Sequence, residues 1–572
     1  MLCAALNKSY YHSTSSVPLA HVTTKDMLDY VVQRTPDKEA YVFPLEKVRL
    51  TFAELKRQVD ALGTKFICIG LRRGDILGIL SSCAPDYILV QHAAAQIGVI
   101  LARLNIGMPN STLQTAILKS ECVALLVGAD DDNVHKQIMQ IIPDLKTTAS
   151  EILQVRDKSK LRLLFTNLAG SQDRWNSKDN TNIGKIDPSN SKQLLEETSK
   201  CVEFGDLYTI LYTSGSTGPI KGTLHSQASH QNLYMMCADR YGWTNDDVLL
   251  ATCTSLSHGS SEMFLIAPLI LGMTSVILSP GANIEDNVAL IQHERCTALF
   301  ATYPSLNNLL HHGNTNQYDC SSLRYIVTSA AAIPQDFIKK INKLFHAKVL
   351  NTYGSSEALF ISGRDLIASE NEVIDKVGRP FGHTEVKIVN ENGGIVPINT
   401  LGELLVRSNF LFYSYINDED KTRQVKSVDG WYRSGDIAKI NNNGYITIVG
   451  RRQDIIMKGG QTMYYSSLVE SLLSHPNVKA AYIVPVPDEE LQEDFCACVS
   501  LIGDIPLSGH ELKKFYSSNI SMDIHVPKHV MVFDHFPKTS TGKIDPKSLS
   551  LEVFEKLSLD KDWLVHGRQT YS

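Results

Sequence analysis

Strand-like and helix-like segments alternate between residues 205 and 350, and this alternation limits the possible fold more than any other feature of the sequence. The apolar run LYTILYT (207–213) precedes a glycine-rich stretch and a helix-like segment, and TALFATY (297–303), RYIVTS (324–329) and AKVLNTY (347–353) repeat the pattern. Strands that alternate with helices form βαβ units around a mostly parallel sheet, and ligands bind at the carboxyl ends of its strands. We therefore predict an α/β domain with a ligand site at those loops.

The pattern changes toward the C-terminus and predicts a second, smaller domain. After about residue 400, short strands such as GYITIVG and FCACVSLI are separated by turns, and SGHELKKFY begins a helix with a Ser508–Glu511 capping box. We predict a large N-terminal domain with mostly parallel, helix-flanked sheets at residues 1–449. A small α+β domain is predicted at residues 450–572.

Composition and charge exclude several classes of partner. The 572 residues are 43% hydrophobic and 20% charged, and the net charge is −6, which is an ordinary globular composition without a basic field for nucleic acid. The longest apolar run, MFLIAPLILGM (263–273), is too short to span a bilayer and contains Pro268 and Gly272, so no transmembrane segment is predicted. The eleven cysteines include no CxxC pair and indicate reduced thiols.

The N-terminal segment bears on the compartment. It contains several hydroxyl groups and no acidic residue before Asp26, as mitochondrial transit peptides do, but it lacks arginine. We expect a cytoplasmic protein, with a mitochondrial location as the alternative. The oligomeric state is left open.

The stretch TSGSTGPIKG (213–222) has the composition of a phosphate-binding loop. It lies between a predicted strand and a predicted helix, and its small and hydroxyl-bearing residues allow backbone amides to point at anionic oxygens. A lone glycine-rich loop is more often a flexible turn. It is not a Walker A loop, because Lys221 is followed by Gly222 rather than by serine or threonine, and STGKI (540–544) fails the same test.

Five motifs in order resemble the core motifs of the adenylate-forming enzymes, which include acyl-CoA synthetases, peptide-synthetase adenylation domains and beetle luciferase. They are TSGSTGPIKG, TYGSSEA (352–358), GWYRSGDIA (430–438), GRRQDIIMKGG (450–460) and PKTSTGKI (537–544), and the resemblance covers nearly the whole chain. The segment SYYHSTSSVPL (9–19) is similar to the medium-chain branch, acyl-CoA synthetase family member 2. The resemblance implies an AMP-binding (adenylation) domain followed by a mobile C-terminal domain that carries a catalytic lysine.

The resemblance implies a reaction of ATP, a small carboxylic acid and CoA, with Mg²⁺ as cofactor. The carboxylate would attack the α-phosphorus and release pyrophosphate, and the CoA thiol would then take the acyl group and release AMP. The glycine-rich loop would wrap the β- and γ-phosphates. The implied ATP-binding residues are Thr213, Ser214, Gly215, Ser216, Thr217, Gly218, Lys221, Tyr353, Ser356, Glu357, Asp436, Arg451 and Lys543.

Some of these residues have more specific implied roles. Glu357 would bind Mg²⁺, a hard cation that prefers oxygen ligands, and Tyr353 would offer a flat face to adenine. Asp436 would accept hydrogen bonds from both ribose hydroxyls, with Arg451 beside it. Lys543 is the implied catalytic residue, because its ammonium would stabilise the charge that develops around the α-phosphate. Each of these residues, taken singly, is more often an ordinary turn or surface residue.

The second half-reaction would require a rotation of the C-terminal domain. The resemblance places Gln453 at the hinge, where relatives carry aspartate or lysine. Gly459 and Gly460 would let the CoA arm approach the backbone, and His258 and Ala331 would line the acyl pocket. A lone histidine is more often a packing residue.

The sequence departs from the family pattern at Ile220, Ala330, Ala331 and Gln453, and the effects of these departures stay open. We expect an ATP-dependent acyl-CoA synthetase, an AMP-forming acid–thiol ligase of fatty acid metabolism, which acts on a medium-chain fatty acid or a related carboxylic acid. Two alternatives remain. One is an adenylate-forming enzyme that passes its acyl group to an acceptor other than CoA, and the other is a non-catalytic relative.

Overall fold

The structure is a computed structural model that describes most of the chain. The described residues are 7–81, 84–128, 132–141, 162–166, 188–213, 220–252, 255–278, 284–312, 317–329, 335–366, 376–459, 461–473, 475–503, 507–519, 526–538 and 544–564. Within these ranges the chain forms four sheets and the helices that pack on them.

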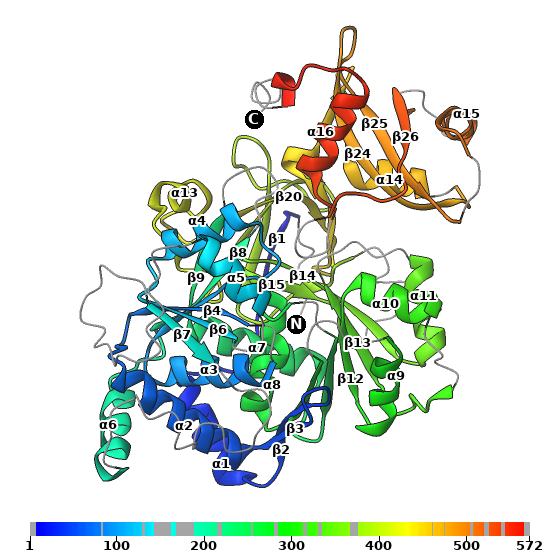
Figure 1. Ribbon diagram of the computed structural model, residues 1–572. Coiled ribbons are helices and arrows are strands. Elements are labelled where there is room, and N and C mark those ends of the chain that lie inside the picture. The colour runs from blue at the N-terminus through cyan, green and yellow to red at the C-terminus, as the bar shows by residue number, and fades with distance from the viewer. Residues whose placement is uncertain are drawn as a thin grey trace.

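Two mostly parallel sheets form the centre of the N-terminal region (Figure 1). The first consists of β4 (Ile76–Leu80), β5 (Ile100–Arg103), β6 (Ala124–Gly128), β7 (Arg162–Thr166), β8 (Leu207–Thr213), β9 (Lys221–Ser226) and β19 (Ser414–Tyr415), in the spatial order 19-9-8-5-4-6-7. The second consists of β2 (Glu39–Phe43), β3 (Val48–Thr51), β10 (Val248–Thr252), β11 (Thr274–Leu278), β12 (Ala298–Ala301), β13 (Tyr325–Ser329), β14 (Lys348–Ser355), β15 (Leu359–Gly363) and β16 (Arg379–Pro380), in the order 16-15-14-13-12-10-11-2-3. Antiparallel pairs occur at the edges of both sheets.

Helices cover these sheets, and three of them join the two sheets in one core. One hydrophobic cluster unites Leu101 of the first sheet and Phe300 of the second with Val90, Tyr234 and Phe264, which lie on the helices α3, α7 and α8. Every residue of α3 is buried. The helices of this region are α1 (Thr24–Arg34), α2 (Phe52–Cys68), α3 (Ala84–Gln96), α4 (Asn110–Ser120), α5 (Asp132–Ile141), α6 (Pro188–Lys200), α7 (Gln227–Tyr241), α8 (Glu262–Leu271), α9 (Ile284–His293), α10 (Tyr303–His312), α11 (Gln335–Phe345) and α13 (Glu419–Val425).

A third sheet is antiparallel and contains residues from both ends of the N-terminal region. Its strands are β1 (Tyr10–Ser13), β17 (Thr384–Val389), β18 (Gly402–Ser408), β20 (Tyr432–Ile440) and β21 (Ile446–Arg451), in the order 1-17-18-20-21. The remaining sheet lies apart from the others at the top of Figure 1. It contains β22 (Ile456–Lys458), β23 (Gln461–Met463), β24 (Val478–Asp488), β25 (Gln492–Leu501) and β26 (His529–Val532), with α14 (Tyr465–Leu473), α15 (Gly509–Asn519) and α16 (Pro546–Lys556) beside it.

The predicted fold class is confirmed. The strand β8 spans exactly the run 207–213, and the other three predicted strands appear as β12, β13 and β14. The predicted capping box is also present, since Glu511 N donates to Ser508 Oγ over 3.2 Å and Ser508 N donates to the Glu511 carboxylate over 2.8 Å. The boundary between residues 449 and 450 falls within β21 and stays a prediction.

The surroundings of the glycine-rich stretch differ from the prediction. Its two ends lie on the antiparallel strands β8 and β9, and α7 begins only at Gln227, so the stretch joins two strands rather than a strand and a helix. The strand β9 is stabilised because it pairs with β8 on one side and β19 on the other. A Cβ on Gly222 would come within 2.8 Å of Ile210 and Ile416, so glycine permits this close packing. The prediction that the stretch lies between a strand and a helix is therefore wrong.

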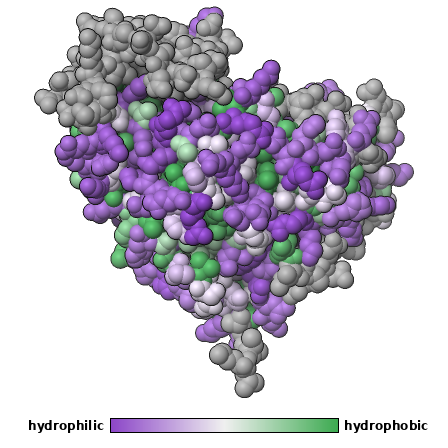
Figure 2. All heavy atoms as spheres, turned by 90° about the horizontal axis from the view of Figure 1, so that it is seen from below, coloured by the Kyte–Doolittle hydropathy of each residue, from purple (hydrophilic) through white to green (hydrophobic). Residues whose placement is uncertain are grey.

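Figure 2 shows that hydrophilic side chains cover most of the face seen from below, with hydrophobic residues in small scattered groups. In the part of the chain that the structure describes, no helix combines the length and the apolar character needed to cross a membrane.

Gly354 permits the close approach of β14 and β15, and we predict that its replacement destabilises the protein. A Cβ at this position would lie 1.6 Å from the main-chain oxygen of Leu359, at a register shift between the two strands. We expect Gly354→Ala to lower the free energy of unfolding by about 2–4 kcal/mol, as measured by denaturant titration. Gly205→Ala is the control, because a Cβ there meets no atom within 4 Å. Equal stability of the two variants would contradict this reading of the strand contact.

Candidate functional site

The structure describes part of the predicted site. It includes Lys221, Tyr353, Ser356, Glu357, Asp436, Arg451, His258, Gln453 and Gly459, together with the main chain of Thr213. The other predicted residues, Ser214, Gly215, Ser216, Thr217, Gly218, Ala330, Ala331, Gly460 and Lys543, lie outside the described residues.

Three of the predicted residues meet around one carboxylate. Asp436 on β20 stands opposite Arg451 on the antiparallel strand β21, and Arg451 Nε lies 2.9 Å from Asp436 Oδ1. The Tyr353 hydroxyl, at the end of β14, donates to Asp436 Oδ2. Arg451 also donates to Ser434 O over 3.1 Å. Because each carboxylate oxygen has two lone pairs, Asp436 retains capacity to accept further hydrogen bonds.

Burial and charge act on Asp436 in opposite directions. Its side chain is 5% exposed, and burial raises its pKa, although Arg451 and the hydrogen bond from Tyr353 oppose the rise. The side chain of Arg451 is 47% exposed. Desolvation lowers the pKa of Arg451, but the charge of Asp436 raises it on balance. The pair therefore holds a buried carboxylate beside a cation that solvent and ligands can reach.

Glu357 lies in the turn between β14 and β15, and hydrogen bonds hold both its side chain and its backbone. The Tyr415 hydroxyl donates to Glu357 Oε1 over 2.7 Å, and Phe412 N donates to Glu357 O over 2.7 Å. The preceding carbonyl, of Ser356, is bound by His225 Nε2 at 2.7 Å and by the Thr223 hydroxyl at 3.2 Å. These contacts fix the turn from β9 and from the segment around β19.

Lys221 is the first residue of β9 and lies near Tyr415, the residue that also binds Glu357. Its Nζ is 5.6 Å from the centre of the Tyr415 ring, whose hydroxyl binds Glu357. Burial lowers the pKa of Lys221, Lys421 lowers it further, and Glu357 and Asp418 oppose this shift. A partly dehydrated ammonium interacts strongly with anions, because little water screens its charge.

The site thus combines residues from three sheets. Lys221 comes from the first sheet, Tyr353 and Glu357 from the second, and Asp436 and Arg451 from the third. The Tyr432 hydroxyl on β20 lies 3.4 Å from Ser355 Oγ on β14 and links the second and third sheets. The charge of Glu357 also raises the pKa of Asp436, although less than burial does. This arrangement can bind a polyanion at one end and a hydroxyl-bearing group at the other.

The remaining described residues occupy three other positions. His258 precedes a short 3-10 helix (Gly259–Ser261), and its Nδ1 accepts from Ser260 N over 3.2 Å, which places its hydrogen on Nε2. Gln453 is exposed in a one-turn 3-10 helix between β21 and β22. Gly459 follows β22 with a φ of 56°, a conformation that favours glycine.

Several supporting residues could not be identified from the sequence. Tyr415 belongs to a segment without a recognisable motif. His225 and Thr223 lie in a strand, although the sequence pattern predicts a loop before a helix there. Lys421 is remote from every motif, yet its charge acts on Lys221. The hydrogen bonds of Tyr415, His225 and Thr223 join residues 58 to 133 positions apart in the chain, so local patterns could not have identified them.

The sequence and the fold are similar to those of known proteins. The chain matches the family model described as AMP-binding enzyme at residues 28–416 and that of the AMP-binding enzyme C-terminal domain at residues 469–543. It is 30% identical to the medium-chain acyl-CoA ligase ACSF2, mitochondrial, of Bos taurus, over 96% of this chain and 91% of the relative. It is 29% identical to the Danio rerio protein of the same name, over 97% of this chain and 92% of the relative.

A solved structure shows the same fold. The o-succinylbenzoate CoA synthetase (MenE) from Bacillus subtilis, in complex with the acyl-adenylate intermediate OSB-AMP, superposes with a TM-score of 0.76. The match covers 93% of this chain and 98% of that chain at 22% sequence identity. At this identity the likeness concerns the fold alone.

The pairing of Asp436 with Arg451 predicts a pH-dependent stability. Arg451→Gln removes the group that lowers the pKa of Asp436, so this pKa will rise further above its ordinary value. A carboxyl whose pKa is raised by folding binds its proton more tightly in the folded state, so it costs stability at high pH and costs less as the pH falls. We expect the variant to lose about 1–3 kcal/mol at pH 8 and less at pH 5, as measured by denaturant titration.

Arg452→Gln is the matched control for this experiment. Arg452 is the next residue, and its partner is Glu403 rather than Asp436. Its Nη1 lies 3.4 Å from Glu403 Oε2. Its loss of stability should stay nearly the same at both pH values. A loss of stability in Arg451→Gln that grows as the pH falls would contradict the raised pKa of Asp436.

Proposed function

Because this chain belongs to the family of AMP-binding enzymes, we infer that it is an ATP-dependent acyl-CoA ligase, an AMP-forming acid–thiol ligase that works through an acyl-adenylate. Relatives that span nearly the same length are named medium-chain acyl-CoA ligases, so a medium-chain fatty acid or a related carboxylic acid is the substrate that we propose. The observation that carries the proposal is the meeting of Lys221 and Glu357 with Asp436 and Arg451 at the junction of three sheets.

The triphosphate of ATP would lie on the Lys221 side of the site. The carboxylate of the acid and the three phosphates are all anionic, so the first step requires cations that offset their charge and hold the reacting atoms in line. Lys221 supplies a partly buried ammonium directly after the glycine-rich stretch, and Lys421 adds a second positive charge nearby. We propose that residues 213–218 and Lys221 bind the β- and γ-phosphates and stabilise pyrophosphate as it leaves.

The donor set around Glu357 fits Mg²⁺. In the described part of the chain, no group of three or more His, Cys, Asp or Glu residues could enclose a metal ion. Mg²⁺ does not require such a cage, because it commonly binds one or two carboxylates together with water and phosphate oxygens. Glu357, held by Tyr415, would be the protein ligand. A bound ion would neutralise part of the charge on the phosphates.

The nucleoside would lie on the Asp436 side. Asp436 is fixed by Tyr353 and Arg451 and can accept hydrogen bonds from the two ribose hydroxyls. Tyr353 is itself oriented by this contact, so its ring would be presented to adenine in one position. Burial raises the pKa of Tyr353, and the charge of Asp436 raises it further. The hydroxyl therefore stays protonated and can donate a hydrogen bond.

The C-terminal region would supply the groups that change between the two steps. We propose Lys543 as the catalytic residue of adenylate formation, Gln453 as the hinge, and Gly459 with Gly460 as the approach for CoA. Gln453 lies two residues after the end of β21, in a single 3-10 turn, and its side chain is exposed. His258 and Ala331 would border the acyl chain.

The names of the relatives support a proposal on the compartment. Relatives from Bos taurus and Danio rerio carry the word mitochondrial in their names. The N-terminal segment without acidic residues is compatible with this location. We therefore propose the mitochondrial alternative over the cytoplasmic one.

Pyrophosphate release with a series of carboxylic acids tests the function directly. We expect release with acids of medium chain length, and we expect AMP and a thioester to appear only when CoA is added. Adenylate formation followed by transfer to another acceptor, with no response to CoA, would favour the alternative acceptor. Absence of pyrophosphate release with every acid would refute the catalytic proposal. The measurement is a coupled pyrophosphate assay with mass spectrometry of the products.

Lys543→Ala separates the two half-reactions. We expect this variant to form acyl-AMP about 100- to 1,000-fold more slowly, because it lacks the cation that stabilises the developing charge. Its conversion of chemically synthesised acyl-AMP and CoA into thioester should stay close to that of the wild-type protein. Lys547→Ala, at an exposed position on α16, is the control and should change neither rate. A normal rate of acyl-AMP synthesis in Lys543→Ala would contradict the assigned role.

A further inference from the structure

A fully buried ion pair lies close to the site but belongs to none of the predicted motifs. Arg103 ends β5 and Glu262 begins α8, and Arg103 Nη1 donates to Glu262 Oε2. Both side chains are 0% exposed. Burial raises the pKa of Glu262, but the charge of Arg103 lowers it to about 2 on balance, so the pair is ionised. Burial of two charges is costly unless both ions have further hydrogen bonds.

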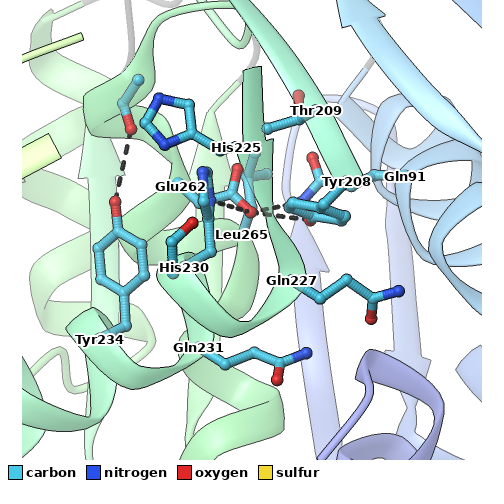
Figure 3. A network of polar contacts seen from close by, with 12 residues as sticks. Gln91, Tyr208, Thr209, His225, Gln227, His230, Gln231, Tyr234, Glu262 and Leu265 are labelled. Atoms are coloured by element: carbon cyan, nitrogen blue, oxygen red, sulfur yellow. Dashed lines mark hydrogen bonds and ion pairs between the residues drawn. The ribbon is translucent and has the colours of Figure 1, made fainter. Parts of the chain in front are cut away.

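The second oxygen of Glu262 is held by groups from three other elements (Figure 3). Glu262 Oε1 accepts from Gln91 Nε2 over 2.9 Å and from the Tyr208 hydroxyl over 2.8 Å. His230 Nδ1 on α7 lies 3.5 Å from the same oxygen. The carboxylate therefore has a fixed position relative to α3, β8 and α7.

The guanidinium of Arg103 clamps the turn that contains His258, which we call the 256–261 turn. Its Nη2 donates to Leu256 O and to Ser261 Oγ, and His258 O lies 3.4 Å away. The Ser261 hydroxyl is in turn 2.8 Å from Leu256 O and 2.7 Å from His258 O. The carbonyls of Leu256 and His258 thus lie beside the Arg103 guanidinium, whose position is fixed by Glu262.

The 256–261 turn is in contact with the strands that carry the site. A Cβ on Gly259 would meet Leu211 at 3.1 Å and Leu359 at 3.8 Å. Leu211 lies on β8 directly before the glycine-rich stretch, and Leu359 begins β15 directly after the Glu357 turn. The Tyr234 hydroxyl points at Gly259 O, 3.5 Å away (Figure 3).

A chain of side chains connects the buried pair to the Glu357 turn. The ring of His230 lies 5.1 Å from the ring of His225, and His225 Nε2 binds the carbonyl of Ser356. Figure 3 shows these two histidines beside Glu262. The same buried network therefore supports the 256–261 turn on one side and the Glu357 turn on the other.

A buried ion pair can select one packing of the core, but it is weak evidence for stability. Apolar residues of similar volume often stabilise a core equally well or better. Here Nη2 of Arg103 donates to two groups of one six-residue turn, so the buried charge also holds the backbone of that turn. We propose that Arg103 and Glu262 are positioning residues for the carboxylic acid substrate, which hold the 256–261 turn in the shape that directs His258 Nε2–H toward the acid. This inference rests on the proposed function, because only there does His258 border the acyl chain.

The double variant Arg103→Met/Glu262→Met tests the proposal. It removes both charges together and leaves no unpaired ion in the core, so the fold is expected to survive. We expect the KM for the acid to rise about tenfold, while the KM for ATP stays within twofold of that of the wild-type protein. Equal changes in both constants, or no change in either, would overturn the proposal. Wild-type activity with the same acid is measured in parallel, so a failure of the proposed function is recognised separately.

Two single substitutions decide the question if the double variant does not fold. Ser261→Ala removes one of the two groups of the 256–261 turn that accept from Arg103 and leaves the contact at Leu256 O, and we expect a rise of about fivefold in the KM for the acid. Tyr87→Phe is the matched control, because its hydroxyl accepts from Arg103 Nε, away from the turn. Hydrogen exchange of peptides that cover residues 256–261 should speed up in Ser261→Ala and not in Tyr87→Phe. Equal effects of the two substitutions in both measurements would overturn the proposal.

Discussion

The turn between β14 and β15 depends on hydrogen bonds from other sheets, and the rest of the candidate site depends on this turn. Its backbone carbonyls are bound by His225 and Thr223 of the first sheet and by the amide of Phe412. Tyr415 then fixes the carboxylate of Glu357. Because Tyr353 precedes the turn by three residues and carries the contact to Asp436, the same anchor aligns the proposed nucleoside side of the site with the proposed phosphate side. A shift of the turn would displace Glu357 from Tyr415 and would disturb the contact of Tyr353 with Asp436.

The parts of the molecule that could be predicted from sequence are those that depend on local pattern. The run LYTILYT formed a strand with the predicted bounds, and the Ser508–Glu511 capping box formed as expected, since hydrophobic pattern and cap chemistry act over a few residues. The strand β9 was missed, because a six-residue segment with Gly222 and polar residues gains its strand conformation only from pairing with β8 and β19. Tyr415 and Arg103 were missed for the same reason. Their partners are 58 and 159 residues away, and no spacing rule connects them.

The two ion pairs of the region serve different purposes because their burial differs. Arg103 and Glu262 are wholly buried and each is fully engaged with protein groups, so this pair fixes backbone and offers nothing to a ligand. Asp436 and Arg451 are paired at the edge of the third sheet, where Arg451 is 47% exposed and Asp436 can accept more hydrogen bonds. A reaction among anions requires charge that is held in place before the substrates arrive, since reorganisation during the reaction costs activation energy. The buried pair keeps the turns in place, and the exposed pair can act on the nucleotide.

The position of Arg451 connects nucleotide binding to the proposed domain rotation. Arg451 is the last residue of β21, and Gln453 follows two positions later. The described residues proposed to hold ATP, from Lys221 to Arg451, all precede this point, whereas Gly459 and the proposed catalytic Lys543 follow it. A rotation at Gln453 would therefore exchange the groups near the α-phosphate without releasing the nucleoside. The pair of Asp436 and Arg451 holds β21 directly before the proposed hinge. A ribose bound to Asp436 would make this strand more rigid. The C-terminal domain would then rotate about a fixed point.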